Sequence, residues 1–292
     1  MSYLWPKFFW MRRAFLVIRA FTVFVLPTVI FSGCSPNNVT IDDGLGRYFD
    51  SAGVKGAFGL FDNGHGHFTI YNLSRYRDSF YTPGGTFDIL QTLLAIQTGA
   101  VKDENSSISD ALDSMQSILN IPGPHTLKEC FRDTSDRGSF AFTQLGFEVL
   151  KRDTVKKWID SLQYGNMRLG DTAHPIFWDN NVLKINCDQQ LGLLKKLYFN
   201  QLPFFARTQE IVRRIMPTES NSEYRFCYKT AQEKKENGNS IGWVMGWVEE
   251  NKHPYFFVVN LESADPAQDL RQTGLVIVKD ILRQQGFFEG KK

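Results

Sequence analysis

Residues 240–261 read SIGWVMGWVEENKHPYFFVVNL, and this stretch predicts two strands joined by a short polar turn. In its first half Ile241, Trp243, Met245 and Trp247 share one face, while glycine and valine alternate on the other. A period of two residues is what a pleated strand produces. The same alternation assigns both tryptophans to a buried core rather than to a ligand-binding platform.

Working outward, two more β-prone runs at 57–61 and 67–71 flank the turn DNGHG and predict an N-terminal hairpin. A third C-terminal strand is expected at 224–230. This order predicts an α+β domain, in which the N-terminal hairpin joins the C-terminal strands in one antiparallel sheet and a helical region is inserted between them. The helices are expected at 86–99, 108–119, 142–152, 154–162, 188–199, 208–215 and 270–285.

Composition and charge exclude several classes of protein. The chain has 292 residues, 42% of them hydrophobic, with 33 basic and 31 acidic side chains. These values are ordinary for a globular domain and exclude a disordered, collagen-like or polytopic membrane chain. A formal net charge of +2 gives no indication of a nucleic-acid partner.

The N-terminal segment has the pattern of an export signal. Residues 1–33 carry four basic side chains and no acidic one, and 20–31 form an apolar run of 12 residues. Such a run is too short to span a bilayer comfortably and fits the core of a signal peptide. It ends in FSGC at Cys34, which resembles the lipidation box of a bacterial lipoprotein. A plain cleaved signal and an uncleaved anchor are the alternatives, and Met11 is an alternative start.

These features predict three parts of the chain and a location. A lipoprotein signal peptide is expected at 1–33, a polar tether at 34–47 and the folded domain at 48–292. Lipidation of Cys34 would attach the domain to the bacterial cell envelope, facing the periplasm. The outer membrane is favoured over the inner one, because serine rather than aspartate follows the cysteine.

The remaining cysteines and the histidines do not form a recognisable metal site. Cys130, Cys187 and Cys227 are odd in number, so at least one is expected to stay free or to pair with another chain. Their spacing matches no zinc pattern, and His65 and His67 are interpreted as part of an exposed turn. No metal and no cofactor are expected.

Several collinear segments resemble the class D (oxacillinase-type) β-lactamases and the penicillin-sensing domains related to them. YTPGGTFDI at 81–89 stands where that family has Pro-x-Ser-Thr-Phe-Lys-Ile, and 164–166 repeat its Tyr-Gly-Asn. Lys-Thr-Ala at 229–231 stands at its Lys-Thr-Gly, and 242–248 fit its last strands. Arg271 falls at the arginine that holds a β-lactam carboxylate. The resemblance covers most of residues 48–288 and implies a β-lactamase/transpeptidase-like fold.

The chain departs from this family at the residues that carry its chemistry. The family uses a serine nucleophile and, one helical turn later, a lysine that is carboxylated to serve as base, whereas this chain has Gly85 and Asp88 there. Glycine has no nucleophile, and aspartate cannot be carboxylated. None of the 17 lysines has a serine three residues before it, so no shifted alignment restores the motif.

The other two motifs are also altered. The serine of the family's Ser-x-Val falls on Thr134 or on Gly138, depending on the register, and neither gives the motif. In the third motif Ala231 replaces glycine, and its Cβ is expected to crowd a substrate lying along the strand.

The resemblance implies that residues for recognising a ligand are retained. Lys229, Thr230 and Arg271 are candidates for binding a carboxylate. The backbone N–H groups of Gly85 and Gln232 match oxyanion-hole positions. Trp178 and Thr134 are further candidates for the pocket wall. Alternatively, Lys229 pairs with Asp88 and Arg271 caps the edge of the sheet.

We therefore expect a catalytically inactive envelope lipoprotein that binds or senses a β-lactam, a peptidoglycan peptide or an envelope protein partner. One alternative is a divergent serine-type enzyme with a relocated nucleophile, for which Thr86, Thr134, Ser139 and Cys130 are candidates and Thr134 or Ser139 are favoured. The other alternative is a structural lipoprotein whose pocket has closed.

Overall fold

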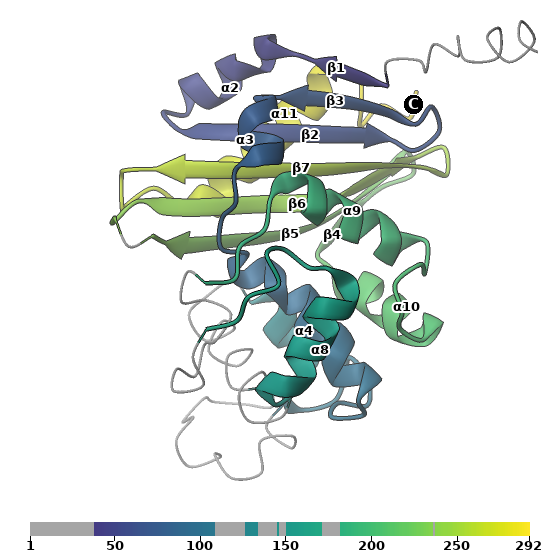
Figure 1. Ribbon diagram of the computed structural model, residues 1–292. Coiled ribbons are helices and arrows are strands. Elements are labelled where there is room, and N and C mark those ends of the chain that lie inside the picture. Colours follow the sequence, from purple (N-terminus) through teal and green to yellow (C-terminus); the bar gives the residue numbers. More distant parts are fainter. Residues whose placement is uncertain (1–37, 109–125, 134–144, 146–149, 171–181, 236) are drawn as a thin grey trace, which may run out of the picture. The chain divides into compact units, whose positions relative to one another are not determined.

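A single sheet organises the folded part of the chain (Figure 1). The computed structural model describes residues 38–108, 126–133, 145, 150–170, 182–235 and 237–292. Within these residues seven strands lie in the order β1-β3-β2-β7-β6-β5-β4. Their bounds are β1 Val39–Ile41, β2 Lys55–Asp62, β3 His67–Tyr71, β4 Thr218–Ser220, β5 Tyr224–Lys234, β6 Ser240–Glu250 and β7 His253–Ser263.

The N-terminal hairpin joins the C-terminal strands, as predicted. β2 pairs antiparallel with β7, so that Phe58 lies opposite Val259. β1 differs from the expectation, since it pairs with β3 in parallel. It lies inside 34–47, the range that the sequence assigns to a tether, and is followed by η2 (Asp43–Leu45) and α2 (Gly46–Ser51). A three-residue strand is too short to show a period in sequence.

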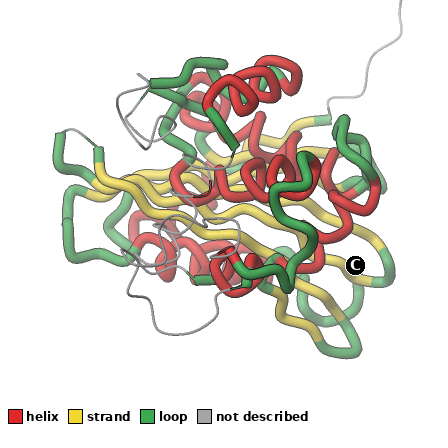
Figure 2. Tube along the Cα trace, turned by 90° about the horizontal axis from the view of Figure 1, so that it is seen from below, coloured by secondary structure: helices red, strands yellow, loops and turns green. Residues whose placement is uncertain are grey.

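Helices cover both faces of the sheet, and Figure 2 shows the strands running between them. Residues of α2 and α11 (Leu270–Gln284) form one apolar cluster with one face of the strands. On the other face the apolar cluster contains residues of the other α-helices that the structure describes. These are α3 (Leu73–Asp78), α4 (Asp88–Gln97), α6 (Leu127–Arg132), α8 (Arg152–Leu162), α9 (Cys187–Tyr198) and α10 (Ala206–Ile215).

The alternating face of β6 explains its unusual sequence. Trp243 and Trp247 are at most 1% exposed and lie in the larger core, which confirms their assignment as core residues. On the opposite face, a Cβ at Gly242 would stand 2.6 Å from the Cβ of Leu270 in α11. A side chain there would push α11 away from the sheet, so the glycine sets how closely this helix packs.

Most predicted helices are present. The expectations at 154–162, 188–199, 208–215 and 270–285 correspond to α8, α9, α10 and α11. The expectation at 86–99 corresponds to a 3-10 turn, η3 (Gly84–Phe87), followed by α4. The helices expected at 108–119 and 142–152 fall almost entirely outside the described residues. The pattern did not predict α3, α6 and β4, which have six residues or fewer.

Candidate functional site

The turn that carries Gly85 is held in place from three sides. Tyr81 exchanges two backbone hydrogen bonds with Ile185, at 3.0 and 2.8 Å. Trp243 of β6 donates its indole N–H to the carbonyl oxygen of Thr82 at 2.8 Å. Gln190 of α9 donates to Thr86 Oγ1 at 2.7 Å. η3 and the first residue of α4, Asp88, are therefore fixed against the middle of the sheet.

β5 presents its side chains alternately to this turn and to α11. Lys229 and Ala231 face η3 and α4, where Lys229 contacts Asp88. Gln232 faces α11, since its Oε1 accepts a hydrogen bond from the Leu270 N–H at 2.7 Å and its Nε2 donates to the Gln268 carbonyl oxygen at 3.2 Å. The side chain of Gln232 therefore anchors the start of α11, and only its backbone is left to serve a ligand.

Asp88 and Lys229 form a buried ion pair. Lys229 Nζ lies 2.8 Å from Asp88 Oδ2, and the two side chains are 4% and 13% exposed, respectively. The same ammonium donates to the Phe131 carbonyl oxygen at 2.7 Å and lies 4.1 Å from the centre of the Phe131 ring. Burial raises the pKa of Asp88, and the Lys229 ammonium opposes that rise. The pairing that the sequence offered as an alternative for Lys229 is thus present.

The structure leaves room for a side chain at Gly85. A Cβ added there would stand 3.6 Å from both the Ala231 Cβ and Asp88 Oδ2, which is ordinary van der Waals contact. Its φ lies outside the left-handed region, so an L side chain meets no backbone strain there. The backbone would accept a serine at this position.

A pocket of about 440 Å³ opens beside the ion pair. Lys229, Thr230 and Arg271 line it together, as the resemblance implies for a carboxylate site. Arg271 is the second residue of α11; its side chain is 35% exposed and its Nε lies 3.4 Å from Asp269 Oδ1. The pocket is therefore open and contains cationic groups that match a carboxylate.

Some pocket residues carried no motif in the sequence. Phe131 and Arg132 line the pocket from the end of α6. Arg132 also donates to the carbonyl oxygen of Ile215 at 2.7 Å, which satisfies the end of α10. A capping box, Thr126 with Glu129, starts α6 and was the available sequence signal for this helix. Trp178 and Thr134 lie outside the described residues.

The Tyr-Gly-Asn motif serves the fold. Gly165 has φ +58°, and a Cβ there would collide with the backbone of Lys184. Asn166 accepts from the Lys184 N–H at 3.1 Å and donates to the Val182 carbonyl oxygen at 2.7 Å. The motif thus holds residues 164–166 against residues 182–185, the segment that pairs with Tyr81 before the turn of Gly85.

Two of the alternative nucleophiles are poorly suited to the role. Thr86 is fully buried, and its Oγ1 donates to the Pro83 carbonyl oxygen at 2.6 Å. Burial raises the pKa of the Cys130 thiol to about 11, so the nucleophilic thiolate is scarce at neutral pH. Cys130, Cys187 and Cys227 are all free and buried. Thr134 and Ser139 fall outside the described residues.

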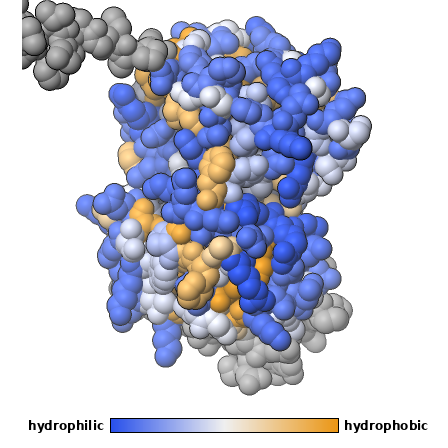
Figure 3. Space-filling model, turned by 90° about the vertical axis from the view of Figure 1, so that its right-hand side faces the viewer, coloured by the Kyte–Doolittle hydropathy of each residue, from blue (hydrophilic) through white to orange (hydrophobic). Residues whose placement is uncertain are grey.

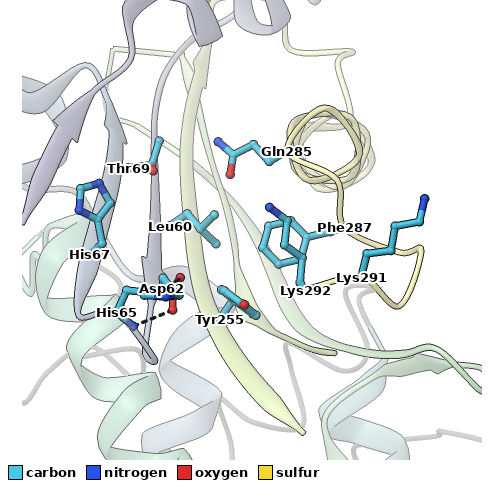
Figure 4. A pocket seen from close by; sticks show the side chains of 10 residues that line it. All are labelled: Leu60, Asp62, His65, His67, Thr69, Tyr255, Gln285, Phe287, Lys291 and Lys292. Atoms are coloured by element: carbon cyan, nitrogen blue, oxygen red, sulfur yellow. Dashed lines mark hydrogen bonds and ion pairs between the residues drawn. The ribbon is translucent and has the colours of Figure 1, made fainter. Parts of the chain in front are cut away.

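A second pocket, of about 390 Å³, lies at the opposite side of the sheet from α4 and is lined by residues of β2, β3, β7 and the C-terminus (Figure 4). In it His65 Nδ1 lies 2.8 Å from Asp62 Oδ2. The described residues contain no group of three or more His, Cys, Asp or Glu side chains that could hold a metal ion. In the same part of the chain, no helix combines the length and apolarity needed to cross a bilayer.

Comparison with known proteins places this geometry in a family. The family model of the penicillin binding protein transpeptidase domain matches residues 61–284. The β-lactamase OXA-20 of Pseudomonas aeruginosa is 27% identical over 261 residues, which are 88% of this chain and 93% of that protein. The β-lactamase OXA-2 of Salmonella typhimurium is 28% identical over 203 residues, 70% of each chain.

Solved structures agree with this. The class D β-lactamase YbXI from Nostoc superimposes with a TM-score of 0.72 at 26% identity, covering 84% of this chain and 99% of that one. The C-terminal domain of the Bacillus licheniformis BlaR penicillin-receptor gives a TM-score of 0.74 at 24% identity, covering 87% and 98%, which shows a shared fold. The chain therefore belongs to the family of penicillin-binding protein transpeptidase domains and is similar to class D β-lactamases.

Proposed function

We propose that this protein is a receptor of the cell envelope that binds a β-lactam or a peptidoglycan peptide without becoming acylated. The observation that carries the proposal is the buried Asp88–Lys229 ion pair beside Gly85, which the resemblance puts at the nucleophile position. The Asp88 carboxylate is already engaged by the Lys229 ammonium 2.8 Å away, and Gly85 offers no hydroxyl that it could activate.

The recognition half of the site supports binding. Thr230 and Arg271 line an open pocket together with Lys229, and a guanidinium can hold a carboxylate with two parallel hydrogen bonds. A pocket filled by its own side chains would instead have favoured a purely structural role. The relative described as a penicillin-receptor has the same fold, which is consistent with a sensing role.

The cell-envelope location remains a proposal from the sequence. The apolar run at 20–31 and the FSGC box support export and lipidation of Cys34. A lipid-anchored domain facing the periplasm would meet both β-lactams and peptidoglycan peptides there. An envelope protein that responds to the bound state would complete a signalling function.

Binding is tested by a thermal-shift titration of the protein with a β-lactam panel and a D-Ala-D-Ala peptide. A ligand that binds only the folded state, at 100 times its Kd, stabilises it by about 2.7 kcal/mol. We expect a saturable rise in Tm that Arg271→Ala abolishes. Arg283→Ala is the matched control, because it removes another arginine of α11 that pairs with Asp280 at the surface.

Mass spectrometry distinguishes the receptor from an enzyme. We expect no penicilloyl adduct and no turnover of nitrocefin. An adduct on Thr134 or Ser139, lost on substitution by alanine, would establish the alternative of a relocated nucleophile. A flat Tm response across the whole panel, with the protein folded, would contradict the proposed receptor function.

A further inference from the structure

The chain enters its folded domain at one end of the sheet, which we call the hairpin end. This end carries the β2–β3 turn at 63–66, the β6–β7 turn at 251–252 and the C-terminal residues after α11. Val39, the first residue of β1, pairs with Phe68 next to the β2–β3 turn. Thr40 Oγ1 lies 2.9 Å from His67 Nε2 at the same place.

The predicted membrane attachment is close to this point along the chain. Cys34 and Val39 are five peptide steps apart, and such a segment spans at most about 18 Å when fully extended. If the apolar run is an uncleaved anchor, its last residue is eight steps from Val39, and that segment spans at most about 29 Å. Either form of attachment would keep the hairpin end near a bilayer.

Two phenylalanines are exposed on the connection between α9 and α10. Phe205 is 70% exposed and Phe199 is 38% exposed. The Phe199 ring centre lies 6.0 Å from that of Phe256, which pairs with Phe61 near the end of β2. Phe199 therefore lies at the hairpin end, and Figure 1 shows the α9–α10 connection on the same side as the C-terminus.

Three cationic side chains belong to this connection or to the neighbouring turn of the hairpin end. Lys196 and Arg207 flank the α9–α10 connection, and Lys252 occupies the β6–β7 turn. All three are exposed, and no ion pair involves any of them within the described part of the chain. Figure 3 faces this side of the molecule and shows apolar patches set in a hydrophilic surface. Exposed aromatic residues with basic neighbours are typical of proteins that lie on a membrane surface.

Other charged groups at the hairpin end partly balance one another. His65, Lys291 and Lys292 line the second pocket with Asp62 (Figure 4). Asp62 is engaged by His65, and Lys291 pairs with Glu289 at 2.6 Å. The side chains of Glu210 and Glu223 are exposed acids of the neighbouring elements. Lys196, Arg207 and Lys252, which form no ion pair with any residue that the structure describes, are therefore the groups best placed to attract anionic lipid.

We propose that the hairpin end docks on an anionic phospholipid surface, with Phe199 and Phe205 entering the headgroup layer and Lys196, Arg207 and Lys252 contacting phosphates. This inference rests on the predicted N-terminal attachment and not on ligand binding by the pocket. β5 begins at the hairpin end, so its second half, with Thr230 and Gln232, points away from the membrane. Docking thus fixes the orientation of the domain and leaves the carboxylate pocket facing the periplasm.

The test uses the full chain reconstituted in vesicles of phosphatidylethanolamine and phosphatidylglycerol. An environment-sensitive fluorophore is attached to Ala206→Cys, beside Phe205, and in a second protein to Ala267→Cys in the loop after β7, at the opposite end of the sheet. The other described cysteines are buried, and the parent protein without a new cysteine gives the background from Cys34. We expect a blue shift of emission at position 206 and none at position 267.

The emission shift should be abolished in a double variant, Phe199→Ser with Phe205→Ser. It should be weakened in a triple variant that carries Lys196→Gln, Arg207→Gln and Lys252→Gln. High salt should weaken the shift of the unmodified surface in the same way. Circular dichroism melting checks that these surface variants remain folded. Equal, water-like emission from both labels would overturn the proposal. An equally large shift in phosphatidylcholine vesicles would contradict the preference for anionic lipid. A shift that grows with the protein-to-lipid ratio would indicate that the hairpin end contacts a second copy of the protein instead of the membrane.

Discussion

At the residue scale, Asp88 places a carboxylate where the resemblance puts a carboxylated lysine, and Lys229 neutralises it at 2.8 Å. A carboxylated lysine also ends in a carboxylate, so the negative charge is kept while the reach of the side chain is lost. Removing one of two buried charges destabilises a fold strongly, because the other charge is left alone in a low-dielectric environment. Loss of a single member of this pair is therefore expected to cost more than at an exposed ion pair.

Removing one member of this pair should be costly. Asp88→Asn leaves the Lys229 ammonium buried without its counter-charge and should lower the free energy of unfolding by about 3–5 kcal/mol. Replacing both residues, by Asp88→Leu and Lys229→Met, should cost much less. Urea denaturation measures both, with the exposed pair Lys156–Asp160 as control, where Asp160→Asn should cost about 0.5 kcal/mol. If Asp88→Asn and the double variant lowered the free energy of unfolding equally, this explanation would be contradicted.

Introducing the serine and lysine of the family motif at positions 85 and 88 tests the proposal that Gly85 and Asp88 are what prevents acylation. Gly85→Ser fits the available space, and Asp88→Lys returns the base, which must be carboxylated to avoid repelling Lys229. The double variant should form a penicilloyl adduct in bicarbonate buffer, as detected by mass spectrometry. Gly85→Ala with Asp88→Lys is the matched control without a hydroxyl. A folded Ser/Lys variant that forms no adduct would show that the pocket has changed elsewhere.

At the element scale, one ionic network ties α3 to the ends of β5 and β7. Arg75 donates to Asn260 Oδ1 at 3.0 and 2.7 Å and to Glu262 Oε2 at 3.2 Å. Lys235 and Asn239 donate to Glu262 Oε1 at 2.8 and 3.0 Å. Burial raises the pKa of Glu262, but these hydrogen bonds and the charge of Lys235 outweigh it and lower the pKa to about 2.

This network should make stability depend on acid. Because the folded pKa of Glu262 lies below its unfolded value near 4.5, its contribution is present above pH 4.5 and is lost as the pH falls towards 2. Glu262→Gln should cost about 1–2 kcal/mol at pH 7, allowing for solvent screening, and the difference from wild type should shrink between pH 4.5 and 2. Urea midpoints across this range measure it, with the exposed Glu289→Gln as control. A difference that does not change with pH would refute the assignment.

Helices and strands could be predicted from the sequence when their pattern of apolar residues is long and distinct. β6 and α11 are long and periodic, so their faces follow from spacing, and β7 is marked by its continuous apolar run. β1 and α3 are set by tertiary contacts, namely the pairing of Val39 with Phe68 and the bonds of Arg75 across the sheet. That Lys229, Thr230 and Arg271 line one pocket was predictable, because the resemblance marks these three positions. Phe131 and Arg132 were not, because only the position of α6 brings them to the pocket.

At the scale of the whole molecule, the residues that define the fold and those that perform the chemistry are separable. Gly165, Asn166 and Trp243 hold the segments around the turn of Gly85 together. The positions of the nucleophile and base lie on this rigid support but contribute little to it, apart from the Asp88–Lys229 pair. The fold can therefore hold an open pocket whichever residues occupy positions 85 and 88.

The three buried thiols have a consequence for measuring how the molecule opens. Cys130, Cys187 and Cys227 lie in α6, α9 and β5, on three different elements. An alkylating reagent reaches a buried sulfur only when its surroundings unfold for a moment, so the rate at each cysteine reports the opening of that element. Peptide mapping after timed alkylation would thus rank the local stabilities of α6 beside the pocket and β5 within the sheet. No label has to be introduced, because the chain already carries its own probes.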